Sequence, residues 1–155
     1  MLKNPLLVVC VLVFTAFVMP ATAQRKSVSG AEVTGTFRYS FTGKFRGNYS
    51  DIKIQALGKG KLRIGFELTY PYMLGKEATA NEGTGTGEAT IDGDTAVYET
   101  HESDGFCKIT IKFVRPGTID VSQEQEGAGC GFGLNVSAAG TYRKISSKTP
   151  KFDKQ

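Results

Sequence analysis

Histidine and cysteine are scarce in this chain of 155 residues, which has one histidine and three cysteines. So few imidazole and thiol groups leave little room for a metal site built from histidine and cysteine ligands. A phosphate-binding loop is also missing, because the glycine-rich segment 83–87 is followed by neither Lys-Ser/Thr nor a helical pattern. We therefore expect no metal site and no cofactor.

The sequence also offers no recognisable set of catalytic residues. The one histidine, His101, lies in the segment 101–105, His-Glu-Ser-Asp-Gly, which holds the residue types of a hydrolase triad. Triad side chains must converge in space, whereas neighbours along one turn point apart. The segment is better explained as a polar hairpin loop. Since no nucleophile, base and orienting group can be nominated together, we expect no enzymatic activity.

The chain has one long apolar run, residues 6–14, and it is shorter than the ~20 apolar residues that a membrane-spanning helix needs. Lys3 precedes it, and Ala21-Thr22-Ala23 follows as a small-x-small cleavage site. These three features predict a secretory signal peptide over residues 1–23 rather than a membrane anchor. We expect an exported protein, periplasmic or extracellular, with no integral membrane segment after cleavage behind Ala23.

Cleavage removes Cys10 and leaves Cys107 and Cys130 in an oxidising compartment. Two cysteines allow one pairing, and no Cys-x-x-Cys redox motif is present. The sequence therefore predicts a Cys107–Cys130 disulfide, which the chain-entropy model values at roughly 3 kcal/mol.

Apolar residues recur with period two after the signal segment, which indicates β-strands, and no stretch has a convincing helical pattern. The sequence predicts hairpin turns at Gly58-Lys59-Gly60 and at Asp92-Gly93-Asp94. The second is a turn rather than a calcium loop, because the residues after Asp94 lack the alternating oxygen ligands of such a loop. Segment 77–87 has little to bury. The expected strands lie around residues 33–41, 52–56, 62–70, 89–91, 96–98, 107–113, 119–121 and 132–142.

Eight antiparallel strands with one apolar face each can close into an up-and-down β-barrel. The similar first and last strands, residues 35–39 and 140–144, could pair to close it. We predict an all-β barrel domain over residues 24–145 and a flexible polar tail over residues 146–155. A two-sheet β-sandwich remains the alternative, because alternation alone does not distinguish the two.

The second half of the chain carries two motifs, Cys130-Gly131-Phe132-Gly133 and Gly140-Thr141-Tyr142. With the strand at residues 107–113, they make residues 84–144 resemble small exported bacterial proteins of lysozyme-inhibitor-like type. The resemblance implies a compact exported β-domain and suggests inhibition by surface contact.

Charge is segregated along the chain. Residues 24–76 carry +7 and residues 105–155 carry +4, whereas residues 77–104 hold eight acids and no lysine or arginine. Such acids could simply keep a strand edge soluble. The sharper hypothesis is that Glu99, Glu102 and Asp104 dock a basic protein partner. Export and a net charge of only +3 after cleavage argue against a nucleic-acid partner.

Two functions from different classes follow. The first is a non-catalytic binding or inhibitor-type protein that acts by surface contact, with a lysozyme-like protein as one target. The second is a calycin-like carrier that holds a small apolar ligand in the barrel interior. Bulky residues expected to point inward favour the first: Phe37, Tyr39, Phe66, Phe113 and Tyr142.

Overall fold

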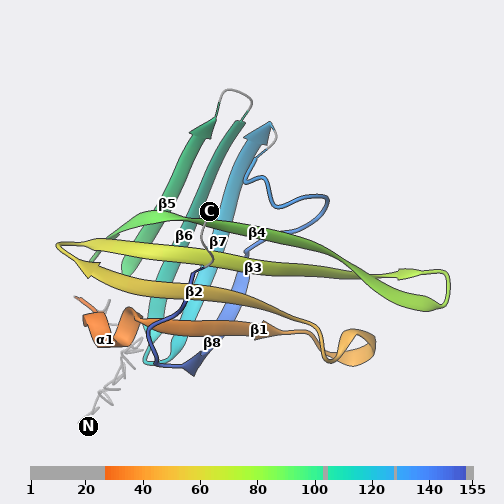
Figure 1. Cartoon of the computed structure of the whole chain (residues 1–155), viewed down its shortest axis with the longest axis horizontal. Helices are drawn as coiled ribbons and strands as arrows, with labels where there is room; N and C mark the ends of the chain where they lie inside the picture. The colour runs from red at the N-terminus through yellow and green to blue at the C-terminus, as the bar shows by residue number, and fades with distance from the viewer. Residues whose placement is uncertain (1–26, 103–104, 128, 153–155) are drawn as a thin grey trace, which may run out of the picture.

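Eight antiparallel strands form one sheet that closes on itself in the computed structural model of the chain (Figure 1). The structure describes residues 27–102, 105–127 and 129–152, so the predicted signal peptide and its cleavage site lie outside the described residues. Each strand pairs with the next along the chain, and the last pairs with the first. The strands are β1 (Gly35–Ser40), β2 (Tyr49–Gly58), β3 (Lys61–Leu74), β4 (Glu77–Asp92), β5 (Thr95–Glu102), β6 (Gly105–Arg115), β7 (Thr118–Gly127) and β8 (Gly140–Ser146). The predicted all-β class and the count of eight antiparallel strands are confirmed, and the two-sheet sandwich is not formed.

The first and last strands close the sheet as predicted, with Phe37 opposite Lys144 and Arg38 opposite Arg143. The alternating pattern predicts that the first strand begins around residue 33, which is too early. Val33 ends a short helix, α1 (Gly30–Val33), and β1 begins only at Gly35. The helix forms here because the Ser29 side chain accepts a hydrogen bond from the Glu32 amide at 3.2 Å, an N-cap that the period-two pattern does not register.

Lys144 fastens this helix to the last strand. Its ammonium donates to the carbonyl oxygen of Thr34 at 2.9 Å and also to that of Glu32. These are carbonyls at the end of α1, which have no partner within the helix. Burial lowers the pKa of Lys144, and the nearby Glu32 carboxylate opposes that shift. One side chain thus joins the N-terminal and C-terminal elements of the described chain.

Aromatic rings fill the interior of the closed sheet. Phe37 and Phe113 meet edge to face with centroids 6.2 Å apart, and Phe66 meets Tyr98 at 5.3 Å. The Tyr142 hydroxyl donates to the Ala138 carbonyl oxygen at 2.9 Å, and burial raises the pKa of this phenol. Further fully buried side chains are Ile52, Ile54, Leu62, Ile64, Leu68, Ile109, Ile111 and Ile119. The strands themselves supply these side chains, so the protein's own residues form the core.

The longest strand, β4, runs through a segment in which the sequence predicted little to bury. Three of its inward positions are glycines, and at two of them an aromatic ring occupies the space that a side chain would take. A Cβ at Gly85 would lie 3.0 Å from the Phe132 ring, and one at Gly87 would lie 2.6 Å from the Tyr98 ring. The alternation of glycine with threonine over residues 83–87 is therefore a strand pattern whose buried face is backbone.

The strand predicted over residues 132–142 is wrong in its first part, residues 132–139. Residues 129–139 form an irregular segment, here called the plug segment, that inserts Phe132, Val136 and Ala138 into the interior, and β8 begins only at Gly140. Positive φ angles at Gly131 (68°), Gly133 (99°) and Asn135 (61°) break the extended backbone. The predicted Cys107–Cys130 disulfide is present and ties the plug segment to β6.

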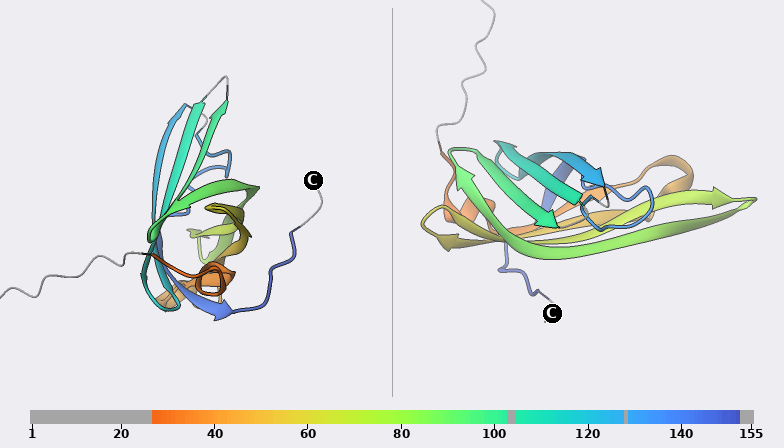
Figure 2. Two further views of the ribbon diagram at one scale, coloured as in Figure 1. Left: turned by 90° about the vertical axis from the view of Figure 1, so that its left-hand side faces the viewer. Right: turned by 90° about the horizontal axis from the view of Figure 1, so that it is seen from above.

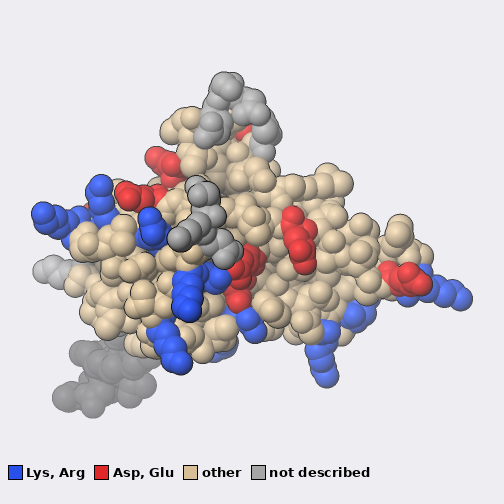
Figure 3. Space-filling model, in the orientation of Figure 1, with Lys and Arg blue, Asp and Glu red and all other residues tan. Residues whose placement is uncertain are grey.

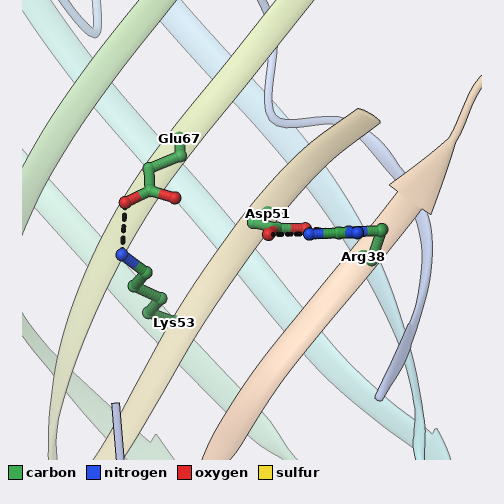
Figure 4. Close-up of polar contacts among 4 residues, drawn as sticks. All are labelled: Arg38, Asp51, Lys53 and Glu67. Atoms are coloured by element: carbon green, nitrogen blue, oxygen red, sulfur yellow. Dashed lines mark hydrogen bonds and ion pairs between the residues drawn. The ribbon is translucent and has the colours of Figure 1, made fainter. Parts of the chain in front are cut away.

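The outer face of β1, β2 and β3 is polar (Figure 4). Arg38 donates two hydrogen bonds of 2.7 Å to the carboxylate of Asp51, and Lys53 pairs with Glu67. The guanidinium of Arg38 also lies 3.6 Å from the centre of the Tyr49 ring. This bidentate pairing raises the pKa of Arg38 and satisfies a carboxylate that is only 7% exposed. The network holds neighbouring strands in register.

Candidate partner-binding site

Strands β4 and β5 pair over only a short stretch of the closed sheet. Only Thr90–Asp92 of β4 pair with Thr95–Val97 of β5, and beyond them the two strands diverge (Figures 1 and 2). The remaining 13 residues of β4, from Glu77 to Ala89, have no strand partner on this side. We call this divergence the β4–β5 fork. It is filled from inside by the plug segment, whose Phe132 packs on Gly83 and Gly85.

The free edge of β4 has a defined hydrogen-bonding pattern. The Ile91 amide donates to the Gly60 carbonyl oxygen at 2.8 Å, so Ile91 belongs to a hydrogen-bonded pair with the β3 side. In an antiparallel ladder such pairs alternate with residues whose amide and carbonyl groups face the other way. Because the β3–β4 register runs without a shift, the even-numbered residues from Ala78 to Glu88 direct their backbone groups to the open side.

A surface notch of about 240 Å³ lies where the two strands separate. It is lined by Lys61, Glu88, Ala89, Thr90, Val97 and Glu99. The Lys61 ammonium lies 3.7 Å from the Glu88 carboxylate, and both side chains are more than 60% exposed. Such exposed pairs are screened by water and stabilise by only about 0–1 kcal/mol. Both carboxylates of the notch therefore remain available to an incoming cation.

The predicted docking residues fall partly on this fork. Glu99 lines the notch and pairs with Lys108 of β6 at 3.7 Å. Glu102 ends β5, and only its backbone, paired with Gly105, is described. Asp104 lies outside the described residues. The structure thus places Glu99 on the fork and brings Glu88 beside it from another strand.

Glu88 and the free edge of β4 were not predicted as parts of the site. The available signal was the acidic run itself, since Glu82 and Glu88 belong to the same segment, 77–104, as Glu99. The sequence could not show that Lys61 and Lys108 come from neighbouring strands to lie beside these acids. Charge segregated along the chain is therefore partly mixed on the folded surface (Figure 3).

His101 lies in β5 opposite Phe106, with ring centroids 5.1 Å apart, rather than in the polar loop expected for it. Among the described residues, no three His, Cys, Asp or Glu side chains form a group that could hold a metal ion. In the same part of the chain, no helix is long and apolar enough to cross a membrane.

Comparison of the chain with protein-family models, with curated proteins and with solved structures finds no match.

Proposed function

We propose that this chain is an exported, disulfide-stabilised protein without catalytic activity that binds a protein partner by surface contact. The observation that carries the proposal is the β4–β5 fork, where a free strand edge and two exposed carboxylates, Glu88 and Glu99, lie together. The packed interior supports contact at the surface over a carrier role, because Phe37, Phe66, Phe113 and Tyr142 occupy the space that an apolar ligand would need.

A basic partner with an extended segment suits this site best. A free edge offers main-chain hydrogen bonds to an added strand, and the acids beside it select for positive charge. A long free edge is otherwise a liability that invites unwanted pairing. The resemblance to lysozyme-inhibitor-like proteins makes basic lysozymes the first targets to try, with inhibition as the proposed consequence of binding.

The charge contribution is tested by association kinetics at several salt concentrations. The mature protein is offered to a panel of lysozymes and other basic proteins, and each partner found is measured against the double variant Glu88→Gln/Glu99→Gln. A second variant neutralises Glu99, Glu102 and Asp104. Association should slow and its salt dependence should flatten in both, because opposed charges act mainly on the association rate.

The matched control removes two exposed acids from β7, in Glu124→Gln/Glu126→Gln, and should leave association unchanged. Binding that is equally fast and equally salt-sensitive in all variants would show that the fork is not the docking surface. Stoichiometric co-purification of an apolar ligand would favour the carrier function instead.

The strand edge is tested separately with Thr86→Pro. The amide of Thr86 faces the open side, so proline removes a hydrogen-bond donor from the edge without breaking the ladder to β3. We expect the variant to fold and to bind at least tenfold more weakly, whereas Thr86→Val, which keeps the amide, should bind like the wild type. Equal binding by both variants would contradict strand addition.

Export is tested by the intact mass of the protein recovered outside the cytoplasm. The chain should begin at Gln24, without residues 1–23. Recovery of the full-length chain from the cytoplasm alone would contradict export.

A further inference from the structure

The hairpin of β3 and β4 continues far past the rest of the sheet. The last β2 residue paired with β3 is Asp51, opposite Glu67, and the Ser50 side chain then bonds the backbone of Thr69. Beyond that point β3 and β4 run on as a two-stranded ribbon, residues 70–81, here called the arm (Figures 1 and 2). An isolated two-stranded ribbon is marginally stable in water, so the arm is expected to gain from a partner.

Exposed hydrophobic side chains gather at the end of the molecule from which the arm projects. Nine large hydrophobic side chains are exposed among the described residues, and six of them lie at this end. They are Tyr39, Tyr49, Tyr70, Met73, Leu74 and Leu134. Scattered single hydrophobic residues need no explanation, but such a concentration marks a contact surface.

Both faces of the arm's tip carry hydrophobic side chains, and the one acid among them, Glu77, lies opposite Leu74. Tyr72 and Leu74 lie on one face because side chains two apart share a face, and Met73 lies on the other. Leu74 is 69% exposed and Met73 is 37% exposed. A protein partner would cover one face of a ribbon, whereas a lipid layer surrounds what enters it. The two-sided tip therefore favours insertion.

Positive charge flanks this apolar tip. Lys76 lies in the turn of the arm, and Lys44 and Arg46 lie in the β1–β2 connection, which is at the same end of the molecule (Figure 1). Figure 3 shows Lys and Arg side chains projecting at this end. The arm itself carries a single acid, Glu77. Cations beside exposed tyrosines and aliphatic side chains match the headgroup region of an anionic bilayer, where each basic residue adds to the attraction.

We propose that the tip of the arm inserts into the interfacial layer of an anionic membrane. Leu74 and Met73 enter the acyl boundary, while Lys76, Lys44 and Arg46 approach lipid phosphates. The notch of the β4–β5 fork lies near Gly60, at the opposite end of the β3–β4 ladder from the tip. A membrane-bound molecule would therefore present the notch to the surrounding solution, yet insertion does not depend on any partner at the notch.

The test uses the absence of tryptophan from the chain. Leu74→Trp places a single reporter at the tip, and Leu57→Trp places one at the β2–β3 hairpin, where Leu57 is 45% exposed and Lys59 lies close by in sequence. Each mature variant is titrated with vesicles of phosphatidylcholine alone and of phosphatidylcholine with 30% phosphatidylglycerol. Brominated lipids serve as quenchers that report depth.

We expect the Leu74→Trp emission to shift to shorter wavelength and to be quenched by brominated lipid in the anionic vesicles only. The Leu57→Trp emission should remain unchanged. In co-sedimentation, Leu74→Asp should weaken vesicle binding of the otherwise wild-type chain at least tenfold, and Leu57→Asp should not. Lys44→Glu/Arg46→Glu should weaken it and reduce its salt dependence.

Three outcomes would overturn insertion. The first is no binding to either vesicle type, and the second is an equal response of both tryptophan reporters. The third is that Leu74→Asp still binds vesicles but no longer binds a protein partner. That result would assign the arm to the protein partner. Circular dichroism of each variant separates loss of binding from loss of the fold.

Discussion

Phe132 lies so close to Gly83 that a methyl group at position 83 would meet the Phe132 carbonyl oxygen at 2.3 Å and its Cβ at 2.7 Å. The ring of Phe132 continues inward to Phe66, with centroids 5.3 Å apart. The Asn81 side chain donates to the Leu134 carbonyl oxygen at 2.8 Å beside this contact. The glycines on the inner face of β4 and the irregular plug segment thus fit one another, and together they close the interior of the sheet behind the free strand edge.

Gly83→Ala should destabilise the protein by about 1–3 kcal/mol, the usual cost of forcing an extra methyl group into a packed interior. The nearest obstacle is a backbone carbonyl, which cannot rotate away as a side chain would. Urea unfolding measures the loss. Gly30→Ala is the control, since its methyl group would meet only the Ala56 Cβ at 3.5 Å. Equal stability of the two variants would show that the plug segment moves freely.

Removing the disulfide should lower the free energy of unfolding by about 2–5 kcal/mol, as is usual for small secreted domains. Cys107→Ser/Cys130→Ser is compared with the wild type by urea unfolding. Limited proteolysis should then cut the variant within residues 129–139 first, because the bond to β6 holds this segment in place. The wild-type mass should be two hydrogens below that of the dithiol. Two titratable thiols in the exported protein would contradict the bond.

Arg38→Ala should cost about 1–3 kcal/mol of stability, because it leaves the buried carboxylate of Asp51 without its two charged hydrogen bonds. The contrasting variant is Lys61→Ala, which removes an exposed pair and should change the unfolding free energy by less than about 1 kcal/mol. Thermal or urea unfolding of both variants makes the comparison. If the two losses are alike, burial of Asp51 does not govern the strength of the Arg38 pair.

Tyr142 should make the fold sensitive to alkali. Its pKa is raised by burial, so the stability it contributes is complete below about pH 10 and is lost as the pH rises towards the folded-state pKa. Tyr142→Phe should be less stable at neutral pH by about 1 kcal/mol, since the Ala138 carbonyl loses its donor. Above pH 10 its stability should fall less steeply than that of the wild type. An equally steep loss of stability above pH 10 in Tyr142→Phe and the wild type would contradict this role of the phenol.

The strands that alternation predicted best are those with large residues on the inner face, such as Cys107 to Phe113 in β6. The middle of β4 gives a weaker signal because its inner positions, Gly83, Gly85 and Gly87, carry no hydrophobicity to detect. Only the folded molecule shows that Phe132 and Tyr98 supply the missing side chains from elsewhere. The alternation of inner and outer positions is present in the sequence, but the inner residues are too small to show as hydrophobic.

The opposite error occurred at residues 132–138, where the apolar alternation is genuine but the backbone is not extended. Phe132, Val136 and Ala138 are buried as the pattern requires, whereas Leu134 is 75% exposed. The positive φ angles of Gly133 and Asn135 on either side turn Leu134 outward. For the candidate site, Glu99 was predicted from charge, but the divergence of β4 from β5 is a property of pairing that one sequence does not reveal.

The pairing of Thr36 with Ser146 brings the two ends of the described barrel side by side. A ring of strands closed in this way has no preferred point at which the polypeptide must start. A short linker could therefore join the C-terminal tail to the residues before α1, and new termini could be opened at Gly75 in the turn of the arm. Such a circular permutant is expected to keep the fold, since every strand would retain both of its neighbours.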